Sequence, residues 1–135
     1  MTYKSSVPMF WRLQDSKYRL VGTRCSKCGA VFLPPRELCH KCKTRESVEK
    51  LVFSGRGEIV SYTIIRSAPE GFEKYIPYAV AIIKLDEGTN ISGQIVGKNI
   101  ENINIGSRVK PVFRRMFEDG DKGLIQYGLK FEIEK

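Results

Sequence analysis

The stretch Cys25-Ser-Lys-Cys28-Gly-Ala-Val-Phe-Leu-Pro-Pro-Arg-Glu-Leu-Cys39-His-Lys-Cys42 contains all four cysteines of this 135-residue chain. A Cys-x-x-Cys pair lets two thiolates converge on one ion from a tight turn, and a second pair returned by a short hairpin completes the tetrahedron that zinc prefers. Four protein ligands leave no open coordination position. The spacing therefore predicts a structural zinc site formed by Cys25, Cys28, Cys39 and Cys42.

Other interpretations of these cysteines stay open. Rubredoxin-like iron uses similar knuckles, Cys-x-x-Cys pairs also occur in redox proteins, and His40 could replace one cysteine as a ligand. Two disulfides would need an oxidising compartment. Residues 1–7 show no apolar segment typical of a signal peptide, so we expect a cytoplasmic protein with reduced cysteines.

The charge of the chain is unevenly distributed. The formal net charge is +8, and residues 1–50 hold 11 of the 23 Lys and Arg but only 4 of the 15 Asp and Glu. This basic N-terminal part is either a solvated surface or a surface for an acidic partner or a phosphate-bearing ligand. No apolar run approaches the roughly 18 residues that cross a membrane, so a membrane-spanning segment is not expected.

The remaining sequence predicts a short helical arm followed by strands. Pro8 suits the first turn of a short helix that carries Phe10 and Trp11, and residues 18–24 partly alternate like a strand leading into the cysteines. Further strands are predicted from β-branched and alternating apolar residues at 58–65, 78–85, 91–96, 108–116 and 126–133. The run 78–85 is nearly continuously apolar, which predicts burial on both faces.

Five such strands predict a small closed barrel of the OB type in a mainly β protein. A tight turn is expected at Asp86-Glu-Gly88, and a short helix or turn at 100–105. The expected division is an N-terminal arm at 1–23, a zinc ribbon at 24–45 and the OB-fold barrel at 46–135.

Catalytic chemistry finds little support in the sequence. His40 is the one histidine and lies in the second knuckle, and zinc would leave no free cysteine. The sequence has no phosphate loop, no nucleophile elbow and no dinucleotide-binding glycine motif. Carboxylates gather at predicted turns, where they are usually solvated. The chain is therefore expected not to be an enzyme.

Nucleic-acid binding is the alternative, because OB barrels bind single strands by stacking bases on exposed aromatic side chains. The second and third barrel strands offer only Tyr78 for such stacking. The late aromatics Phe113, Phe117, Tyr127 and Phe131 mostly alternate within strands, which favours a place in the core. The missing stacking surface argues against nucleic acid.

In their order, several short motifs resemble the DUF35 family. These are Phe10-Trp11, Tyr18 to Cys25, the two knuckles around Phe32 to Arg36, Ser54-Gly-Arg-Gly57, Tyr62-Thr63, Pro77-Tyr78, Leu85-Asp-Glu-Gly88 and Ile105-Gly-Ser-Arg-Val109. The set covers nearly the whole chain. The resemblance implies an OB fold preceded by a rubredoxin-like zinc ribbon, with all four cysteine positions filled.

The resemblance also implies a non-catalytic companion of thiolase-superfamily enzymes. Archaeal members of this family accompany an acetoacetyl-CoA thiolase and a hydroxymethylglutaryl-CoA synthase of the mevalonate route. The implied role is a scaffold subunit of an acyltransferase complex that bridges the enzymes and helps to bind or pass acyl-CoA. The implied ligands are Zn²⁺ and CoA or acyl-CoA.

Two surfaces are candidates for this role. Phe10 and Trp11 lie on an arm too short to bury them alone, so they either cap the fold or anchor a partner enzyme. Pantetheine needs an apolar slot, and the nucleotide end of CoA carries phosphates that favour arginine. The residues expected to bind CoA are therefore Phe72, Tyr75, Tyr78, Arg114 and Arg115.

Overall fold

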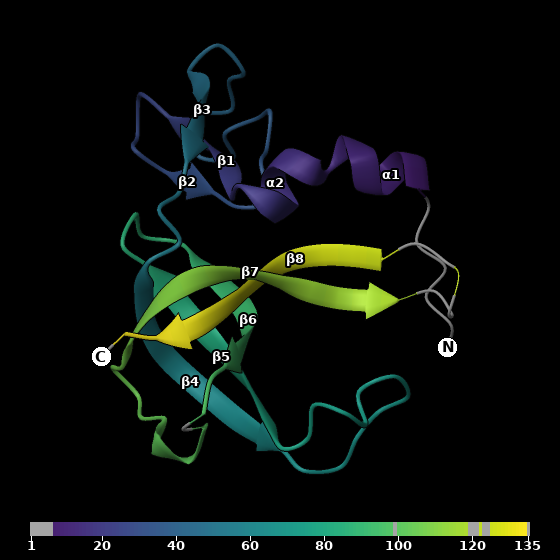
Figure 1. Cartoon of the computed structure of the whole chain (residues 1–135). Coiled ribbons are helices and arrows are strands. Elements are labelled where there is room, and N and C mark those ends of the chain that lie inside the picture. The colour runs from purple at the N-terminus through teal and green to yellow at the C-terminus, as the bar shows by residue number, and fades with distance from the viewer. Residues whose placement is uncertain (1–6, 99, 119–121, 123–124, 135) are drawn as a thin grey trace. The chain divides into compact units, whose positions relative to one another are not determined.

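The computed structural model describes residues 7–98, 100–118, 122 and 125–134 of the chain (Figure 1). The chain folds into two compact units, Met1–Phe53 and Ser54–Lys135, and each is described by itself. Among the described residues, no helix has both the length and the apolar character needed to cross a lipid bilayer.

The first unit begins with two short helices, α1 (Val7–Arg12) and α2 (Gln14–Tyr18). Pro8 lies in the first turn of α1, where a missing N–H costs nothing. The amide of Leu13 donates to the carbonyl of Met9 at 3.0 Å, which carries the helical path towards α2. Helices of six and five residues are too short to be stable alone, so their contacts hold them in place.

A three-stranded antiparallel sheet follows, in the order β2-β1-β3. Its strands are β1 (Val21–Cys25), β2 (Val31–Phe32) and β3 (Val48–Val52). Gly22 lies so close to Phe32 and Phe53 that a Cβ atom at this position would clash with both. The sequence analysis predicted no strand at 48–52, and here this segment pairs with β1 over its whole length.

The core of this first unit is small. Leu20 and Phe53 are buried in it. The cluster around the cysteines has Cys25, Phe32 and Cys39 as buried members, and Ala30, Cys42 and Val48 pack against them. Half of these six residues are cysteines. A cluster of this size supplies little hydrophobic stabilisation for a 53-residue unit. A metal ion that crosslinks the cysteines would add the stability that this small core does not supply.

The second unit is a closed five-stranded barrel in the order β4-β5-β6-β8-β7, which confirms the predicted mainly β fold with an OB-type barrel. Its elements are β4 (Gly57–Ile65), β5 (Tyr78–Leu85), β6 (Asn90–Val96), the 3-10 helix η1 (Ile100–Asn102), β7 (Arg108–Glu118) and β8 (Ile125–Ile133). All neighbours are antiparallel except β6 and β8, whose parallel pairing closes the barrel.

The barrel interior is lined by aliphatic side chains and one phenyl ring. Its buried members include Ile59, Ala79, Ala81, Ile83, Leu85, Ile95, Val109 and Phe131. Gly93 is required on β6 because a Cβ atom there would overlap the ring of Phe131. The predicted burial of 78–85 on both faces is wrong. Ile82 is 45% exposed, since β5 buries alternate residues and its other face is only partly covered.

The hairpin of β7 and β8 extends beyond the closed part of the barrel (Figure 1). β7 pairs with β4 only at Arg108 and Val109, and β8 pairs with β6 only at Phe131 and Glu132. The residues nearer the hairpin tip pair only with each other, so no third strand continues the sheet there.

This extension overturns part of the prediction for the late aromatics. Phe131 is buried as expected, but Phe113 is 49% exposed and Tyr127 is 40% exposed. Their rings stack with centroids 5.5 Å apart and an interplanar angle of 11°. Alternation alone could not show that the sheet beneath them is only two strands wide. The side chain of Phe117, the other late aromatic, lies outside the described part of the structure.

The predicted tight turn after β5 is present. The amide of Gly88 donates to the carbonyl of Leu85 at 2.9 Å, and the φ angle of Gly88 is 107°, which suits glycine. Asp86 in this turn receives both guanidinium N–H groups of Arg108, at 2.7 and 2.9 Å. This bidentate contact ties the β5–β6 turn to the start of β7.

Candidate metal centre and aromatic cluster

Two knuckles of similar construction present the four cysteines. Cys25 ends β1, and the amide of Gly29 donates to its carbonyl at 2.9 Å, with a φ of 74° at Gly29. In the second knuckle the amide of Lys43 donates to the carbonyl of Cys39 at 2.7 Å, with a φ of 52° at Lys43. Each turn therefore folds its two cysteine side chains towards the same point.

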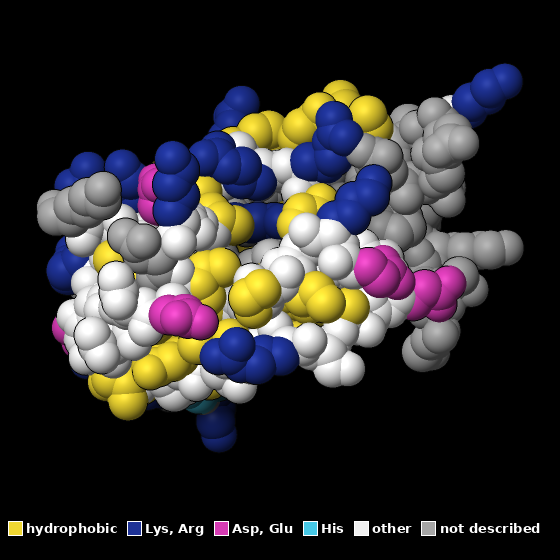
Figure 2. Space-filling model, turned by 60° about the horizontal axis from the view of Figure 1, so that its bottom comes forward, with side chains coloured by type: hydrophobic (Ala, Val, Ile, Leu, Met, Phe, Trp, Pro, Cys, Tyr) yellow, Lys and Arg dark blue, Asp and Glu magenta, His cyan; other side chains and the backbone are white. Residues whose placement is uncertain are grey.

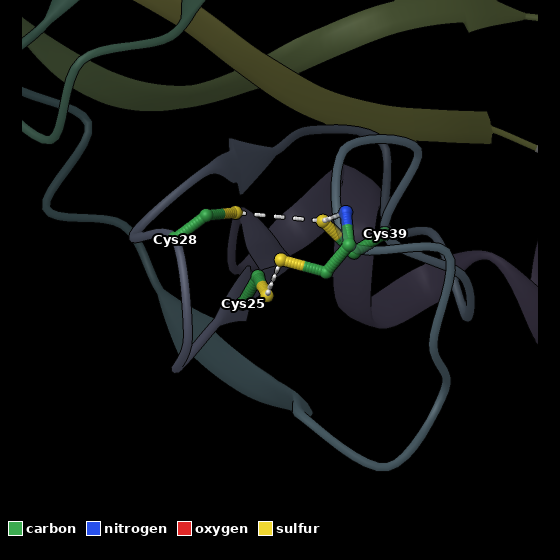
Figure 3. A group of neighbouring side chains, drawn as sticks. Cys25, Cys28 and Cys39 are labelled. Atoms are coloured by element: carbon green, nitrogen blue, oxygen red, sulfur yellow. Dashed lines mark hydrogen bonds between the residues drawn. The ribbon is translucent and has the colours of Figure 1, made fainter.

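The four sulfur atoms form one compact group. All lie within 4.8 Å of one another, and Figure 3 shows the labelled side chains of Cys25, Cys28 and Cys39 directed to a common centre. The Sγ atoms of Cys28 and Cys39 are 3.5 Å apart, and those of Cys25 and Cys42 are 3.9 Å apart. Zinc with sulfur ligands at 2.3 Å needs tetrahedral edges of about 3.8 Å, so the group fits this ion closely.

Hydrogen bonds prepare this group to hold a cation. The Ser47 hydroxyl lies 3.2 Å from the Cys25 sulfur and, by donating to the thiolate, lowers the pKa of Cys25 to about 6. The hydrogen bond with Cys28, together with burial and the charge of Cys25, raises the pKa of Cys42 to about 12. Crowded thiolates repel one another, and a divalent cation removes that repulsion by binding all four.

Two of the other interpretations of the cysteines, a pair of disulfides and a histidine ligand, fit this geometry less well. All four thiols are free, and their separations far exceed the roughly 2.05 Å of a disulfide bond. His40 does not join the sulfur group, because its ring packs edge-on against Phe32 with centroids 5.5 Å apart. The structure thus brings together the four cysteines named as candidate ligands and leaves His40 apart from them.

The structure also brings together the three predicted aromatic residues of the second unit. Phe72 stacks on Tyr78 with centroids 5.6 Å apart, and Phe72 and Tyr75 are 6.0 Å apart. Tyr78 is only 6% exposed and anchors this aromatic cluster at the start of β5, whereas Tyr75 is 38% exposed. The cluster therefore has a buried base and an accessible rim.

The two predicted arginines behave differently. Arg114 pairs in register with Gly128, and Arg115 pairs with Tyr127. Successive residues of a strand point to opposite faces, so only one of the two arginines can share a face with Lys130 on β8. Lys130 pairs in register with Val112 of β7, so the two side chains share a face of the hairpin. Arg114 lies two positions from Val112 and is therefore the arginine on this face.

Lys130 is the residue that the sequence analysis missed. It is only 3% exposed, and its Nζ atom lies 4.7 Å from the ring centroid of Tyr75. In the sequence it alternates with Leu129 and Phe131 as an ordinary polar position of a strand. No pattern in the sequence indicates that the loop carrying Tyr75 covers this lysine.

The two predicted interface residues also separate. Phe10 packs edge-on against Tyr18 with centroids 5.6 Å apart, and the Nζ atom of Lys17 lies 5.0 Å from its ring centroid. Trp11 is 72% exposed. Phe10 therefore holds the two helices together, and Trp11 is the most exposed of the large apolar side chains described in the first unit.

Comparison with known proteins gives the class and then the family. Residues 16–48 match the rubredoxin-like zinc ribbon domain of ChsH2, and residues 52–114 match the C-terminal OB-fold domain of ChsH2. The chain is therefore a zinc-ribbon and OB-fold protein. It is 47% identical to a DUF35 domain-containing scaffold protein of Methanocaldococcus jannaschii over 122 residues, which cover 90% of this chain and 86% of that protein.

A second DUF35 domain-containing scaffold protein, from Methanothermobacter thermautotrophicus, is 42% identical over 90% of this chain and 92% of that protein. The chain belongs to the DUF35 family, as its motifs predicted. Among solved structures, the Ltp2-ChsH2(DUF35) aldolase covers 98% of both chains with a TM-score of 0.67 and 24% identity, which supports the fold.

Proposed function

We propose that this chain is a non-catalytic, zinc-containing scaffold subunit of a complex of thiolase-superfamily enzymes. In this proposal it bridges an acetoacetyl-CoA thiolase and a hydroxymethylglutaryl-CoA synthase of the mevalonate pathway in the cytoplasm, and helps to bind or pass acyl-CoA. The naming of two relatives as scaffold proteins, and of a structural neighbour as an aldolase assembled with a DUF35 protein, supports a companion role.

The exposure of Trp11 is the observation that carries this proposal. A tryptophan that is 72% exposed on a short helix contributes little to the stability of its own unit through burial. Val7 and Met9 on the same helix are also more than half exposed, which gives α1 an apolar surface. Tryptophan is enriched among the residues that dominate binding energy, so this surface suits an enzyme partner with an apolar groove.

The test is the binding of the thiolase-type enzyme from the native source to the zinc-loaded chain, with wild-type and variant proteins. Trp11→Ala is expected to weaken binding by about 2 kcal/mol or more, because a buried anchor would be lost. Leu38→Ala is a matched control, since Leu38 is 47% exposed in the same unit but lies outside α1. Equal binding by the Trp11 variant and wild type would remove α1 from the proposed interface.

Acyl-CoA is the proposed ligand of the second unit. The aromatic cluster of Phe72, Tyr75 and Tyr78 offers an apolar wall for pantetheine, and Arg114 is available for a phosphate. Arg115 stays a proposed contact on the opposite face of β7. The chain itself is proposed not to react with acyl-CoA, so purified protein should leave acetoacetyl-CoA unchanged over hours.

Single-stranded nucleic acid is the second candidate ligand, and one observation favours it. The stacked rings of Phe113 and Tyr127 are exposed on the face of the hairpin that also carries Arg115, which is the arrangement on which bases stack. If this function holds, Phe113→Ala should weaken oligonucleotide binding, and that binding should fall steeply with salt. Tight, salt-sensitive binding of single strands without an enzyme partner would favour this candidate over the scaffold.

A further inference from the structure

Lys130 is a buried cation without an anionic partner. It is 3% exposed, and its Nζ atom makes no hydrogen bond or ion pair with any residue that the structure describes. Its contact is the face of the Tyr75 ring, 4.7 Å from Nζ to the centroid. The contact of a cation with an aromatic ring offsets only part of the free energy that burying an ammonium group costs.

The surroundings of Lys130 add positive charge and no negative charge. Burial lowers the pKa of Lys130, and the charge of Arg114 lowers it further. Arg114 uses Nη1 to donate to the carbonyl of Phe113 at 3.1 Å and forms no ion pair with a described residue. Glu132 is the acidic residue two positions along the same face of β8, and its carboxylate lies 3.8 Å from the Nζ atom of Lys110.

The ammonium group is nevertheless not completely sealed from solvent. Among the described side chains that are not exposed, one polar atom is fully sealed from solvent and has no hydrogen-bond partner. This atom is Oε2 of Glu87 and not Nζ of Lys130. The Nζ atom of Lys130 also lacks a hydrogen-bond partner, so it must retain some contact with solvent. The ammonium group of Lys130 therefore lies just below the surface, against the Tyr75 ring and on the same face of the hairpin as Arg114.

We propose that Lys130 and Arg114 form a binding site for an oxyanion, a phosphate group, with the ring of Tyr75 as its wall. The ammonium group supplies a point charge at the base and the guanidinium a planar donor at the rim, which together suit a phosphate. Figure 2 shows one face of the molecule, where Lys and Arg side chains lie beside hydrophobic patches and acidic side chains are fewer.

The aromatic cluster indicates what the phosphate is attached to. Phe72 and Tyr75 continue from the wall of the site to the buried Tyr78, so an apolar or planar body joined to the phosphate would lie against rings. CoA has this composition. The assignment of CoA rests on the proposed function, whereas the oxyanion site rests on Lys130 and Arg114 alone. Free phosphate or pyrophosphate shares the same chemistry.

The test is calorimetric titration of the full zinc-loaded chain at low salt with CoA, pyrophosphate and pantetheine. CoA and pyrophosphate are expected to bind, and pantetheine, which lacks the nucleotide phosphates, at least tenfold more weakly than CoA. Lys130→Met should weaken CoA binding at least tenfold and leave the melting temperature equal or higher, because an unpaired buried charge is removed. Lys84→Met, which removes an equal charge from an exposed position of β5, should change binding less than twofold.

Arg114→Gln provides a second variant at the exposed rim of the site and should weaken CoA binding at least threefold. Binding by both variants at the wild-type level would overturn the site, as would the absence of CoA and pyrophosphate binding to the wild-type chain. Pyrophosphate binding as tight as that of CoA would support the oxyanion site and remove CoA as its specific ligand. The enzyme partner should bind Lys130→Met as it binds wild type, so failure of this site leaves the proposed scaffold role intact.

Discussion

At the scale of single residues, the chemistry of the metal centre depends on a group that is not a ligand. Ser47 is only 7% exposed, and its hydroxyl lies 3.2 Å from the Cys25 sulfur. A hydrogen bond to a metal-bound thiolate disperses its charge and fixes its direction. This serine follows the second knuckle by five residues, and only the return of the chain along β3 brings it to the first knuckle.

Replacement of this hydroxyl should weaken metal binding without unfolding the barrel. Ser47→Ala is expected to lower zinc affinity by about 10- to 100-fold, the usual effect of losing a group that supports a ligand. Competition with a chromophoric chelator measures this affinity. Ser26→Ala is the matched control, because Ser26 lies exposed within the first knuckle. Equal affinities for Ser47→Ala and wild type would show that the hydrogen bond does not support the site.

At the scale of elements, the barrel strands were predicted closely because their β-branched runs and turns are local signals. The strand at 78–85 and the turn at 86–88 lie where the sequence placed them. The strand β3 escaped prediction because Glu49 and Lys50 interrupt a short apolar pattern, and its pairing with β1 is a contact between distant segments. The sequence also could not show which segments cover which side chains. Lys130 is buried because the loop that carries Tyr75 lies against it, whereas Phe113 is exposed because no described segment covers it.

The ion pair between Asp86 and Arg108 links two elements and should give the barrel a pH dependence. Hydrogen bonding from Arg108 lowers the pKa of Asp86 below 3.8, its usual value. The carboxylate of Asp86 therefore binds a proton more readily in the unfolded chain than in the folded chain. The stabilisation of the fold by this ion pair is complete above about pH 4, and it is lost as the pH falls through the lower pKa of the folded state. Asp86→Asn should reduce the loss of stability on acidification.

Urea unfolding at several pH values between about 5 and 2.5 measures this effect. Both groups are nearly half exposed, so only the direction is predicted. Glu101→Gln is a suitable control, because Glu101 is exposed on η1 and forms no ion pair among the described residues. A variant at Asp86 that loses stability with acid as steeply as wild type would contradict the proposed linkage.

At the scale of the whole molecule, we expect the two units to depend on metal to different degrees. In the first unit, the cluster around the cysteines has three buried members, two of them cysteines, whereas the second unit encloses a barrel of aliphatic side chains. Removal of zinc with a chelator should therefore unfold residues up to Phe53 and leave the barrel strands protected. Amide hydrogen exchange measured residue by residue distinguishes the two units. Loss of protection throughout β4 to β8 after zinc removal would show that the barrel also needs the metal.

The central claim is that the chain works as a companion to enzymes. The most direct test is affinity purification of the zinc-loaded chain with its bound partners from the native source. The purification is carried out at two salt concentrations, with and without nuclease treatment, and mass spectrometry identifies the proteins that co-purify. The account predicts that a thiolase-type enzyme and a hydroxymethylglutaryl-CoA synthase co-purify at a fixed ratio, that nuclease does not alter the complex, and that Trp11→Ala depletes it. Purification of the chain with nucleic acid and without either enzyme would contradict the account.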